Sequence, residues 1–395
     1  MSKIILDNDK EIKEVEKNAE KTQVIHNISN IKNEINREKK VDFNEREYKE
    51  FEPTKKLNKL KIFGLFILTL IAIGIVSFDV LLYGPNYKFR DWLVTNAMNT
   101  LHHKYLATWF YSDAEIEEVM ARNRVIEVGE NTDTSLLKDV PPSIKGRVSY
   151  ANEYEREILE REEGQDYKII ELHDDDYDGY LAVIYEPSRI SVVTSNSLGS
   201  SGQYLVDMAK NNNAAVAING GGFADEGGNG SGGIPYGLTF SDGELKYNYG
   251  YRDETFSLIG FDNNNNLVLG RYNQYEAKEI GIRDAVTFSP FLIVNGKSSE
   301  IEGNGGWGYG PRTAIGQRAD KIVLFVVIDG RRINKQGASM ADLISIFERY
   351  GAVNAANLDG GTSSAMVVEN EIINDPMDAS GNHRTRPVAT SFIFK

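Results

Sequence analysis

The pattern of apolar and polar positions predicts a membrane-crossing helix near the start of the chain. Residues 62–78 carry no charge, and the apolar character resumes after Asp79 and continues through Tyr83. A helix of about 20 residues, rising ~1.5 Å per residue, crosses a hydrocarbon core ~30 Å thick. Four lysines lie just before this run, at positions 55, 56, 59 and 61. The positive-inside bias therefore predicts a single-pass protein of the cell membrane, with a cytoplasmic N-terminus, a span over residues 60–83 and the rest of the chain outside.

Residues 1–59 are polar and rich in charges of both signs, which is typical of a solvated cytoplasmic tail. Within this tail, Val24, Ile28, Ile31 and Ile35 follow a spacing of four, three and four. That spacing also suits a short amphipathic or coiled-coil helix. The stretch is too short to define an oligomeric state.

Residues 84–165 are predicted to form a helical stalk or linker on the outer side. Ser112 or Asp113 is placed to cap a helix that begins there. The pair His102-His103 lacks a third ligand at a suitable spacing, and adjacent residues point to different faces of a helix. Packing is therefore favoured over metal binding for these two histidines.

Residues 166–395 read as the globular domain. A β-branched run over 321–329 predicts a buried strand, and Asp242-Gly243 and Asn295-Gly296 predict hairpin turns. Residues 339–350 predict a helix, capped by Ser339 and ended by Gly351. Its expected buried positions are Met340, Leu343, Ile344 and Phe347. The fold class is therefore α+β, a mixed or antiparallel sheet with few packed helices.

Composition excludes several functions. The net charge of −14 disfavours nucleic-acid binding, and the lack of cysteine excludes disulfides and thiolate metal sites. The glycine-rich residues 220–235 lack the Gly-Lys-Ser/Thr of a phosphate-binding loop, so they predict a mobile loop bordering a site instead of a nucleotide site. No cofactor is predicted.

One segment partly matches a calcium loop. Asp174, Asp176, Asp178 and Gly179 occupy positions 1, 3, 5 and 6 of the EF-hand pattern, but Tyr185 stands where a bidentate glutamate is required. The flanking segments read as strands, so a hairpin tip is the favoured interpretation. Weak binding of a divalent cation such as calcium is the alternative.

Several ordered motifs resemble one family. They are PRTAIG (311–316), VVIDGRR (326–332) and GAVNAANLDGGTSS (351–364), with AAVAINGGGFAD (214–225) upstream and RPVATSFIF (386–394) downstream. Together they are similar to the phosphodiester glycosidase family over about the last 230 residues. This resemblance implies cleavage of a sugar-1-phosphate diester. The chain departs from the family pattern by an extra glycine before Phe223 and by Thr362 in place of a frequent glycine.

The chemistry of such a substrate suggests roles for these motif residues. Arginine forks match phosphate oxygens, and because phosphate is already a good leaving group, charge stabilisation and a base or nucleophile at the anomeric carbon matter most. Asp329 and Asp359 each precede a glycine, where the pair forms either a turn or a ligand contact. The expected catalytic residues are Asp329, Asp359, Arg312 and Asn219, the last by its family position. The expected substrate-binding residues are Arg331, Gly360, Gly361, Thr362, Ser363 and Arg386.

The resulting hypothesis is a membrane-anchored extracytoplasmic phosphodiester glycosidase that acts on a sugar-1-phosphate diester in a cell-surface glycopolymer. One alternative is a non-catalytic module of the same fold that binds polysaccharide or teichoic acid. Another is a phosphodiesterase that cuts the P–O bond.

Overall fold

The computed structural model describes residues 21, 23–24, 26–34, 58–100, 103–139, 149–225, 230–378 and 380–395. The chain divides into two units, residues 1–75 and 76–395. In the first unit residues 26–34 are helical, and the side chains of Val24, Ile28 and Ile31 are exposed. Ile35, the fourth position of the predicted apolar pattern, lies outside the described residues.

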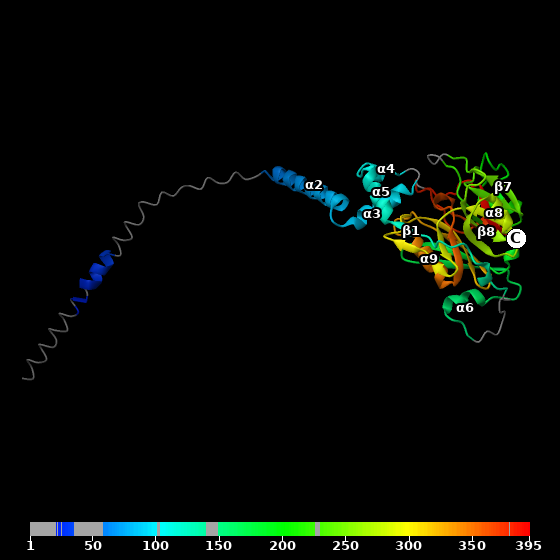
Figure 1. Ribbon diagram of the computed structural model, residues 1–395. Coiled ribbons are helices and arrows are strands. Elements are labelled where there is room, and N and C mark those ends of the chain that lie inside the picture. Colours follow the sequence, from blue (N-terminus) through cyan, green and yellow to red (C-terminus); the bar gives the residue numbers. More distant parts are fainter. Residues whose placement is uncertain are drawn as a thin grey trace, which may run out of the picture. The chain divides into compact units, whose positions relative to one another are not determined.

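Helix α2 (Lys59–Tyr83) contains the predicted apolar run (Figure 1). Within the described ranges it is the one helix long and apolar enough to cross a membrane. Its side chains are exposed along its whole length except near the C-terminal end, where Leu82 is buried.

Three short helices follow α2: α3 (Tyr87–Met98), α4 (Tyr105–Thr108) and α5 (Asp113–Arg122). The Ser112 side chain accepts a hydrogen bond from the Glu115 N–H in a capping box, which confirms the predicted start of a helix there. The three helices share a small apolar core, and an ion pair at 2.5 Å joins Asp91 of α3 to Arg122 of α5. His102 lies outside the described residues.

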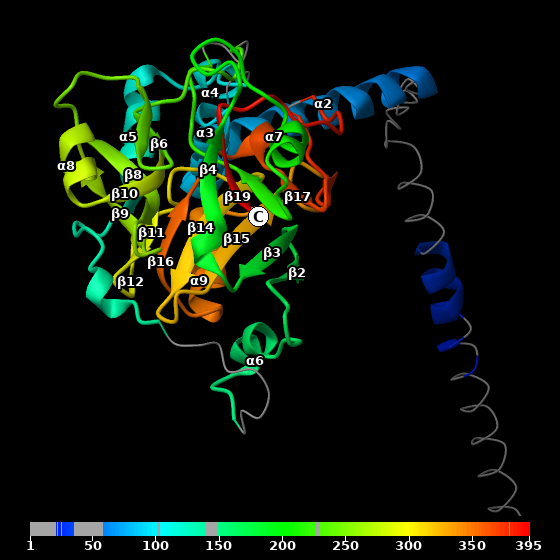
Figure 2. The same cartoon turned by 90° about the vertical axis from the view of Figure 1, so that its right-hand side faces the viewer.

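A seven-stranded sheet forms the centre of the second unit, and all of its neighbouring strands are antiparallel. Figure 2 shows four of its strands side by side, β14, β15, β3 and β2. The predicted strand over 321–329 is β15, which is buried at every position. In order across the sheet the strands are β12 (Lys297–Ser298), β11 (Phe291–Val294), β16 (Ala352–Asn357), β14 (Arg312–Arg318), β15 (Val323–Ile328), β3 (Asp178–Ile184) and β2 (Tyr167–His173).

Two five-stranded antiparallel sheets pack on one face of the central sheet through a shared core. The first sheet has the order β7 (Glu244–Asn248), β6 (Leu238–Ser241), β10 (Ile282–Thr287), β8 (Phe256–Asp262) and β9 (Leu267–Tyr272), with α8 (Gln274–Glu279) after β9. The second has the order β18 (Glu371–Ile372), β17 (Met366–Val368), β5 (Val216–Asn219), β19 (Thr390–Phe394) and β4 (Ile190–Thr194), with α7 (Leu205–Asn211) packed on it. The fold is therefore α+β with antiparallel sheets.

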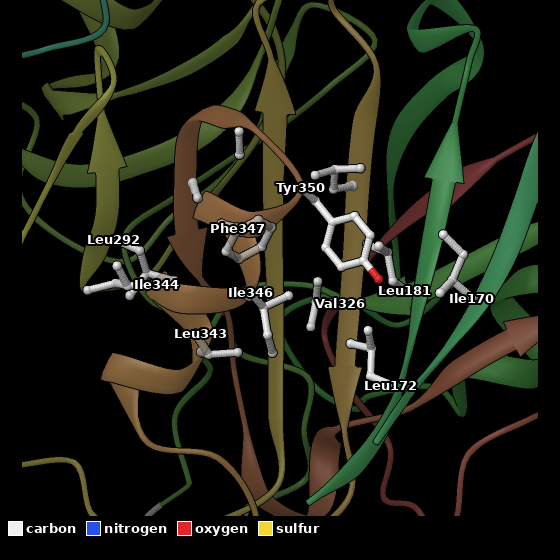
Figure 3. Close-up of a cluster of buried hydrophobic side chains, with 14 of the residues drawn as sticks. Ile170, Leu172, Leu181, Leu292, Val326, Leu343, Ile344, Ile346, Phe347 and Tyr350 are labelled. Carbon is white, nitrogen blue, oxygen red and sulfur yellow. The ribbon is translucent and has the colours of Figure 1, made fainter. Parts of the chain in front are cut away.

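Helix α9 (Met340–Arg349) covers the other face of the central sheet (Figure 3). The Ser339 side chain accepts from the Asp342 N–H, and the four predicted apolar positions of the helix are all buried. Gly351 has φ +74°, the left-handed conformation expected after a helix end. The sequence-based prediction of this helix, its cap and its buried face is confirmed.

The predicted hairpin turns are also present. Asp242 and Gly243 both have positive φ between β6 and β7, and Asn295 and Gly296 do so between β11 and β12. Two successive left-handed residues are typical of the tight turns that suit the twist of paired strands.

Part of the predicted stalk packs onto the globular domain. Strand β1 (Arg124–Ile126) pairs with β13 (Glu300–Glu302), and the Thr132 N–H donates to the Leu269 carbonyl at 2.8 Å. Ile158 and Leu159 of α6 (Glu153–Leu159) belong to the core beneath α9. The described residues 124–132 and 153–159 therefore include segments that pack on the globular domain. The domain boundaries at residues 84 and 166 remain predictions.

Candidate active site

The antiparallel order of the central sheet brings three motifs to one edge. Strand β14 starts at Arg312, which is paired with Ile328 at the end of β15. Ala314 is paired with Asn357, the last residue of β16. Because neighbouring strands run in opposite directions, the start of β14 lies beside the residues that follow β15 and β16. Arg312 is therefore close in the fold to the two Asp-Gly pairs at 329–330 and 359–360.

A second sheet contributes to the same edge. Strand β5 ends at Asn219, which is paired with Ser391 near the start of β19. The Asp359 N–H donates to the Gly220 carbonyl at 3.1 Å, so the segment after β16 is tied to the segment after β5.

A cavity of about 1060 Å³ opens at this shared edge. Seven of the ten residues predicted from the sequence line it: Arg312, Arg331, Asp359, Gly360, Gly361, Thr362 and Arg386. Asp329, Asn219 and Ser363 are not among the lining residues.

Arg312 is a buried cation without a carboxylate partner in the described part of the chain. Its Nε donates to the Ala338 carbonyl at 3.0 Å, and its Nη2 donates to the carbonyls of Trp307 and Gly308 at 2.8 and 2.6 Å. Burial, together with the nearby charge of Arg331, lowers the pKa of Arg312 to about 10. A buried positive charge held only by carbonyl oxygens is a strong candidate for binding an anion.

Arg331 is the second such cation. Its backbone is left-handed, with φ +63°, and its Nη1 donates to the Thr362 hydroxyl at 2.9 Å and to the Met377 carbonyl at 2.7 Å. Burial of this half-buried side chain lowers its pKa, the charge of Asp378 opposes that shift, and the charge of Arg386 adds weakly to it. The unusual backbone angle thus aims this side chain at the loop after β16 instead of into solvent.

The other two arginines at the cavity are paired with aspartates that also line it. Arg386 Nη1 lies 2.5 Å from Asp225 Oδ2, and its guanidinium carbon lies 4.3 Å from the centre of the Phe223 ring. Arg384 Nε lies 2.5 Å from Asp378. The cations left to attract a ligand are therefore Arg312 and Arg331.

Asp359 is the lining carboxylate that has no arginine partner. Its Oδ2 is buried without a hydrogen-bond partner in the described structure. Burial raises the pKa of this carboxyl above its ordinary value, although the charge of Arg386 and the neighbouring Ser363 and Gly360 oppose the shift. A carboxyl with a raised pKa that lines the same cavity as Arg312 and Arg331 is typical of a functional site.

Asn219 lies behind the cavity and holds Asp359 in place. Its Nδ2 donates to the Asp359 carbonyl at 2.6 Å, while its Oδ1 accepts from the Thr313 hydroxyl at 2.7 Å and the Ala365 N–H at 3.2 Å. Both polar atoms of this buried side chain have partners and the residue does not line the cavity, so the geometry supports a positioning role.

Asp329 does not meet Asp359 in the cavity. Its Oδ1 accepts from the Asn374 side chain at 2.8 Å, and both oxygens accept from the Asp375 N–H at 3.1 Å. Burial raises its pKa, and Arg332 lies 3.6 Å away. The sequence hypothesis of a carboxylate pair therefore has one member in the cavity and one in the network behind it.

The predicted phosphate contacts from the glycine turn also need correction. The Gly361 N–H donates to the Pro311 carbonyl at 2.9 Å, so it is not free for a phosphate oxygen. Ser363 is buried in the short helix η4 (Gly361–Ser363). Gly361 instead lies against Arg331, because a side chain at this position would come within 2.9 Å of Arg331 Nη2.

Several lining residues were not among the sequence candidates. Apolar and aromatic side chains of the cavity are suited to cover the faces of a sugar ring. They are Phe223, Tyr204, Tyr236, Phe288, Trp307 and Tyr309. Asp225 borders the site as the predicted loop should, although residues 226–229 lie outside the described structure. The glycine-rich run 303–310 before Arg312 was the available signal for Trp307 and Tyr309.

Within the described ranges no group of three or more His, Asp or Glu side chains is arranged to hold a metal ion. At the β2–β3 hairpin tip, Asp178 contacts His173 at 3.0 Å and Lys335 at 3.2 Å. This carboxylate of the partial calcium pattern is therefore occupied by basic side chains.

The fold and the cavity define an α+β protein whose cavity is lined, among the described residues, by two arginines without carboxylate partners and by one carboxylate without an arginine partner. Residues 212–395 match the model of the phosphodiester glycosidase family. The C-terminal region of the chain is therefore similar to this family.

A relative from Bacillus subtilis, the SPbeta prophage-derived uncharacterized protein YomE, is 32% identical over 196 residues. The match covers 47% of this chain and 29% of that protein, so the chain spans less than a third of the relative's length. Two solved structures are also similar. The zebrafish N-acetylglucosamine-1-phosphodiester alpha-N-acetylglucosaminidase catalytic domain, auto-inhibited by its pro-peptide, has a TM-score of 0.48 at 20% identity, covering 58% of this chain and 82% of that one. A putative exported protein of Burkholderia pseudomallei has a TM-score of 0.41 at 17% identity, covering 55% and 74%.

Proposed function

We propose that this protein is a membrane-anchored phosphodiester glycosidase that hydrolyses a sugar-1-phosphate diester of a cell-surface glycopolymer outside the cytoplasm. The observation that carries the proposal is the position of the buried Arg312 and the half-buried Arg331 at the same cavity as Asp359. Neither arginine has a carboxylate partner among the described residues. The apolar helix α2 and the lysines before it support the anchor and its orientation.

Arg312 and Arg331 bind the phosphate, whose single negative charge compensates their burial. Water attacks the anomeric carbon and gives its proton to Asp359, while the bond between that carbon and the phosphate oxygen breaks. The electron pair of this bond stays on the departing phosphate monoester, where the two arginines stabilise the developing second charge. The raised pKa of Asp359 favours its role as the proton acceptor.

Hydrolysis of a simple substrate by the full chain in detergent tests this function. Methyl N-acetylglucosaminyl phosphate is incubated in water enriched in oxygen-18, and the products are analysed by mass spectrometry. Release of sugar with an unlabelled methyl phosphate identifies cleavage at the anomeric carbon. A labelled phosphate product identifies a phosphodiesterase that cuts the P–O bond, and binding without any product identifies a non-catalytic module.

Two substitutions separate the roles. Asp359→Asn is expected to abolish turnover while inorganic phosphate still binds, because both arginines remain. Arg312→Ala is expected to weaken both turnover and phosphate binding by at least about a hundredfold, the range seen when one charge-stabilising donor is removed. Arg156→Ala provides a matched control, because this exposed arginine lies on α6 away from the cavity. Wild-type turnover in both site variants would exclude the assignment.

A further inference from the structure

Aromatic side chains are exposed at the end of α2 and on the helices that follow it. Among the described residues from 83 to 109, the exposed tyrosines and tryptophans are Tyr83, Tyr87, Trp92, Tyr105 and Trp109, the last exposed by 72%. The rings of Tyr105 and Trp109 lie 4.7 Å apart. Tyrosine and tryptophan are enriched where a protein meets the boundary between membrane and water. The neighbouring Lys88 and Lys104 are also exposed, and their charges complement anionic lipid head groups.

These helices are tied to the C-terminal end of α2. The Phe110 ring lies 5.7 Å from the Phe78 ring, and the Tyr83 hydroxyl donates to the Phe110 carbonyl at 3.0 Å. The Tyr111 hydroxyl donates to the Leu82 carbonyl at 2.9 Å. Because α2 ends at Tyr83, these contacts place Phe110 and Tyr111 against its last turns.

The same helices also form a wall of the cavity. Asn96, Asn99, Thr100 and His103 all line it. None of these residues falls within the region that matches the family model, which starts at residue 212. The wall therefore lies outside the part of the chain that matches the family model.

The wall is coupled to the anion site through the glycine-rich loop 303–310. Asn96 Oδ1 accepts from the Tyr309 N–H at 2.9 Å, and Asn99 Nδ2 donates to the Gly306 carbonyl at 2.5 Å. The next carbonyls of that loop, those of Trp307 and Gly308, hold Arg312. Helix α3 thus orders the loop that positions the phosphate-binding guanidinium.

We propose that the α3–α4 segment, described over residues 87–100 and 103–111, rests on the lipid surface and presents the cavity to it. The substrate is then a sugar phosphate diester whose alcohol portion is a lipid anchored in the same bilayer. The sugar and phosphate enter the cavity past the α3 wall, and the lipid chain stays in the membrane. This inference rests on the proposed function for its chemistry, while the membrane contact of α3–α4 stands on its own.

Tryptophan fluorescence tests the membrane contact without any substrate. The chain has three tryptophans, Trp92, Trp109 and Trp307. The full chain is reconstituted into phosphatidylcholine–phosphatidylglycerol vesicles whose acyl chains carry bromine near the head group. With Trp109 as the sole tryptophan, emission should fall by roughly twofold or more, as for an interfacial residue. With Trp307 as the sole tryptophan it should change little, because this residue lies in the cavity. Equal quenching of the two variants would overturn the membrane contact.

Turnover of two probes tests the substrate class. One is phytanyl N-acetylglucosaminyl phosphate in the same vesicles, and the other is the water-soluble methyl N-acetylglucosaminyl phosphate. Trp109→Ser should reduce turnover of the phytanyl probe about tenfold, because the enzyme then meets the membrane-bound substrate less often in a productive orientation. Turnover of the methyl probe should not change. Tyr251→Ser is the matched control, an exposed aromatic between β7 and β8 that should alter neither rate.

The outcomes of this assay separate the two proposals. If the wild-type chain hydrolyses neither probe, the proposed function fails, and the fluorescence experiment still decides the membrane contact. If it hydrolyses both probes and Trp109→Ser changes them equally or not at all, the lipid-anchored substrate is refuted and the glycosidase function stands.

Discussion

The side-chain amide of Asn219 donates to the main-chain carbonyl of Asp359 at 2.6 Å, across the boundary between two sheets. Asn219 ends β5 in one sheet, and Asp359 follows β16 in the other. The only free carboxylate among the described lining residues is therefore fixed by a buried residue that does not reach the cavity itself. Asn219 thus positions the Asp359 main chain, and Asp359 supplies the carboxylate of the cavity.

Replacing Asn219 with alanine should affect stability and turnover together. The substitution leaves the Thr313 hydroxyl, the Ala365 N–H and the Asp359 carbonyl without their partner in a buried environment. Leaving such a group unsatisfied costs about 1–3 kcal/mol. We expect Asn219→Ala to lower the free energy of unfolding by at least that amount, measured with urea, and to reduce kcat/KM because the Asp359 loop loses its anchor. Asn212→Ala, which removes a single helix-end hydrogen bond to the Met208 carbonyl, should lose some stability and retain full activity.

The raised pKa of Asp359 makes a second prediction, about stability and pH. An aspartate in the unfolded chain titrates near pH ~3.9. Below that pH the carboxyl is protonated in both the folded and the unfolded protein, so its contribution to the free energy of unfolding is fully present. As pH rises through the raised pKa of the folded state, this contribution is lost, because ionisation is less favourable in the folded protein than in the unfolded one.

Asp359→Asn removes this titration. The variant should therefore be inactive and yet have a higher Tm than the wild type at pH 7, with the difference vanishing below about pH 4. Thermal unfolding of both proteins at several pH values measures the effect. Because Asp329 is present in both proteins, its own raised pKa cancels in the comparison. A variant that is less stable than the wild type at pH 7 would show that Asp359 is stabilised as an anion.

Asp329 was predicted from the sequence to act together with Asp359, and its position supports a different expectation. Both of its oxygens accept hydrogen bonds from residues 374 and 375, outside the cavity lining. We expect Asp329→Asn to destabilise the fold by about 1–3 kcal/mol, since the amide replaces one of the two acceptor oxygens by an NH2 group that cannot accept from the Asp375 N–H. Its kcat should remain at least about tenfold above that of Asp359→Asn. If single-turnover rates show that both variants are equally inactive, then Asp329 acts in the chemistry as well.

The sequence predicted the fold best where local and global preferences agree. Helix α9 shows its cap, its buried face and its terminal glycine in the residue pattern, and the tight turns at Asp242 and Asn295 follow from residues that tolerate positive φ. The motif order also placed Arg312, Arg331 and Asp359 correctly in one cavity. These residues lie at strand ends or in the loops that follow, and the antiparallel strand order places these motifs, which are distant in the sequence, next to one another.

The sequence did not show which polar atoms of the site form hydrogen bonds with one another. Gly361 appeared free to bind phosphate through its N–H, but that group meets the Pro311 carbonyl only because β14 and the loop after β16 are adjacent. Nor did it show that the segment after α2 returns to the cavity. Asn96 and Asn99 are ordinary helix-surface residues by pattern, and their contacts with loop 303–310 are separated by more than two hundred positions. Contacts between residues so far apart in the sequence produce no local periodicity from which they could be predicted.

That long-range contact makes the last prediction. Gly308 has φ +60°, and a side chain added there would come within 2.6 Å of Asn96 Oδ1. Its carbonyl accepts from Arg312 Nη2 at 2.6 Å. Gly308→Ala should push the loop away from α3 and withdraw the Gly308 carbonyl from Arg312. Binding of inorganic phosphate should then weaken by about tenfold, because roughly one charge-assisted hydrogen bond that positions the guanidinium is lost.

Gly296→Ala separates this effect from backbone strain. Gly296 also has positive φ, +75°, but a side chain there would meet nothing within 4 Å. The left-handed backbone alone costs roughly 1–2 kcal/mol in either variant, so both should lose a similar amount of stability from strain. Only Gly308→Ala should change the phosphate Kd measured by calorimetry. If the two variants bind phosphate equally well, Arg312 is held without help from α3, and the juxtamembrane wall and the anion site are independent.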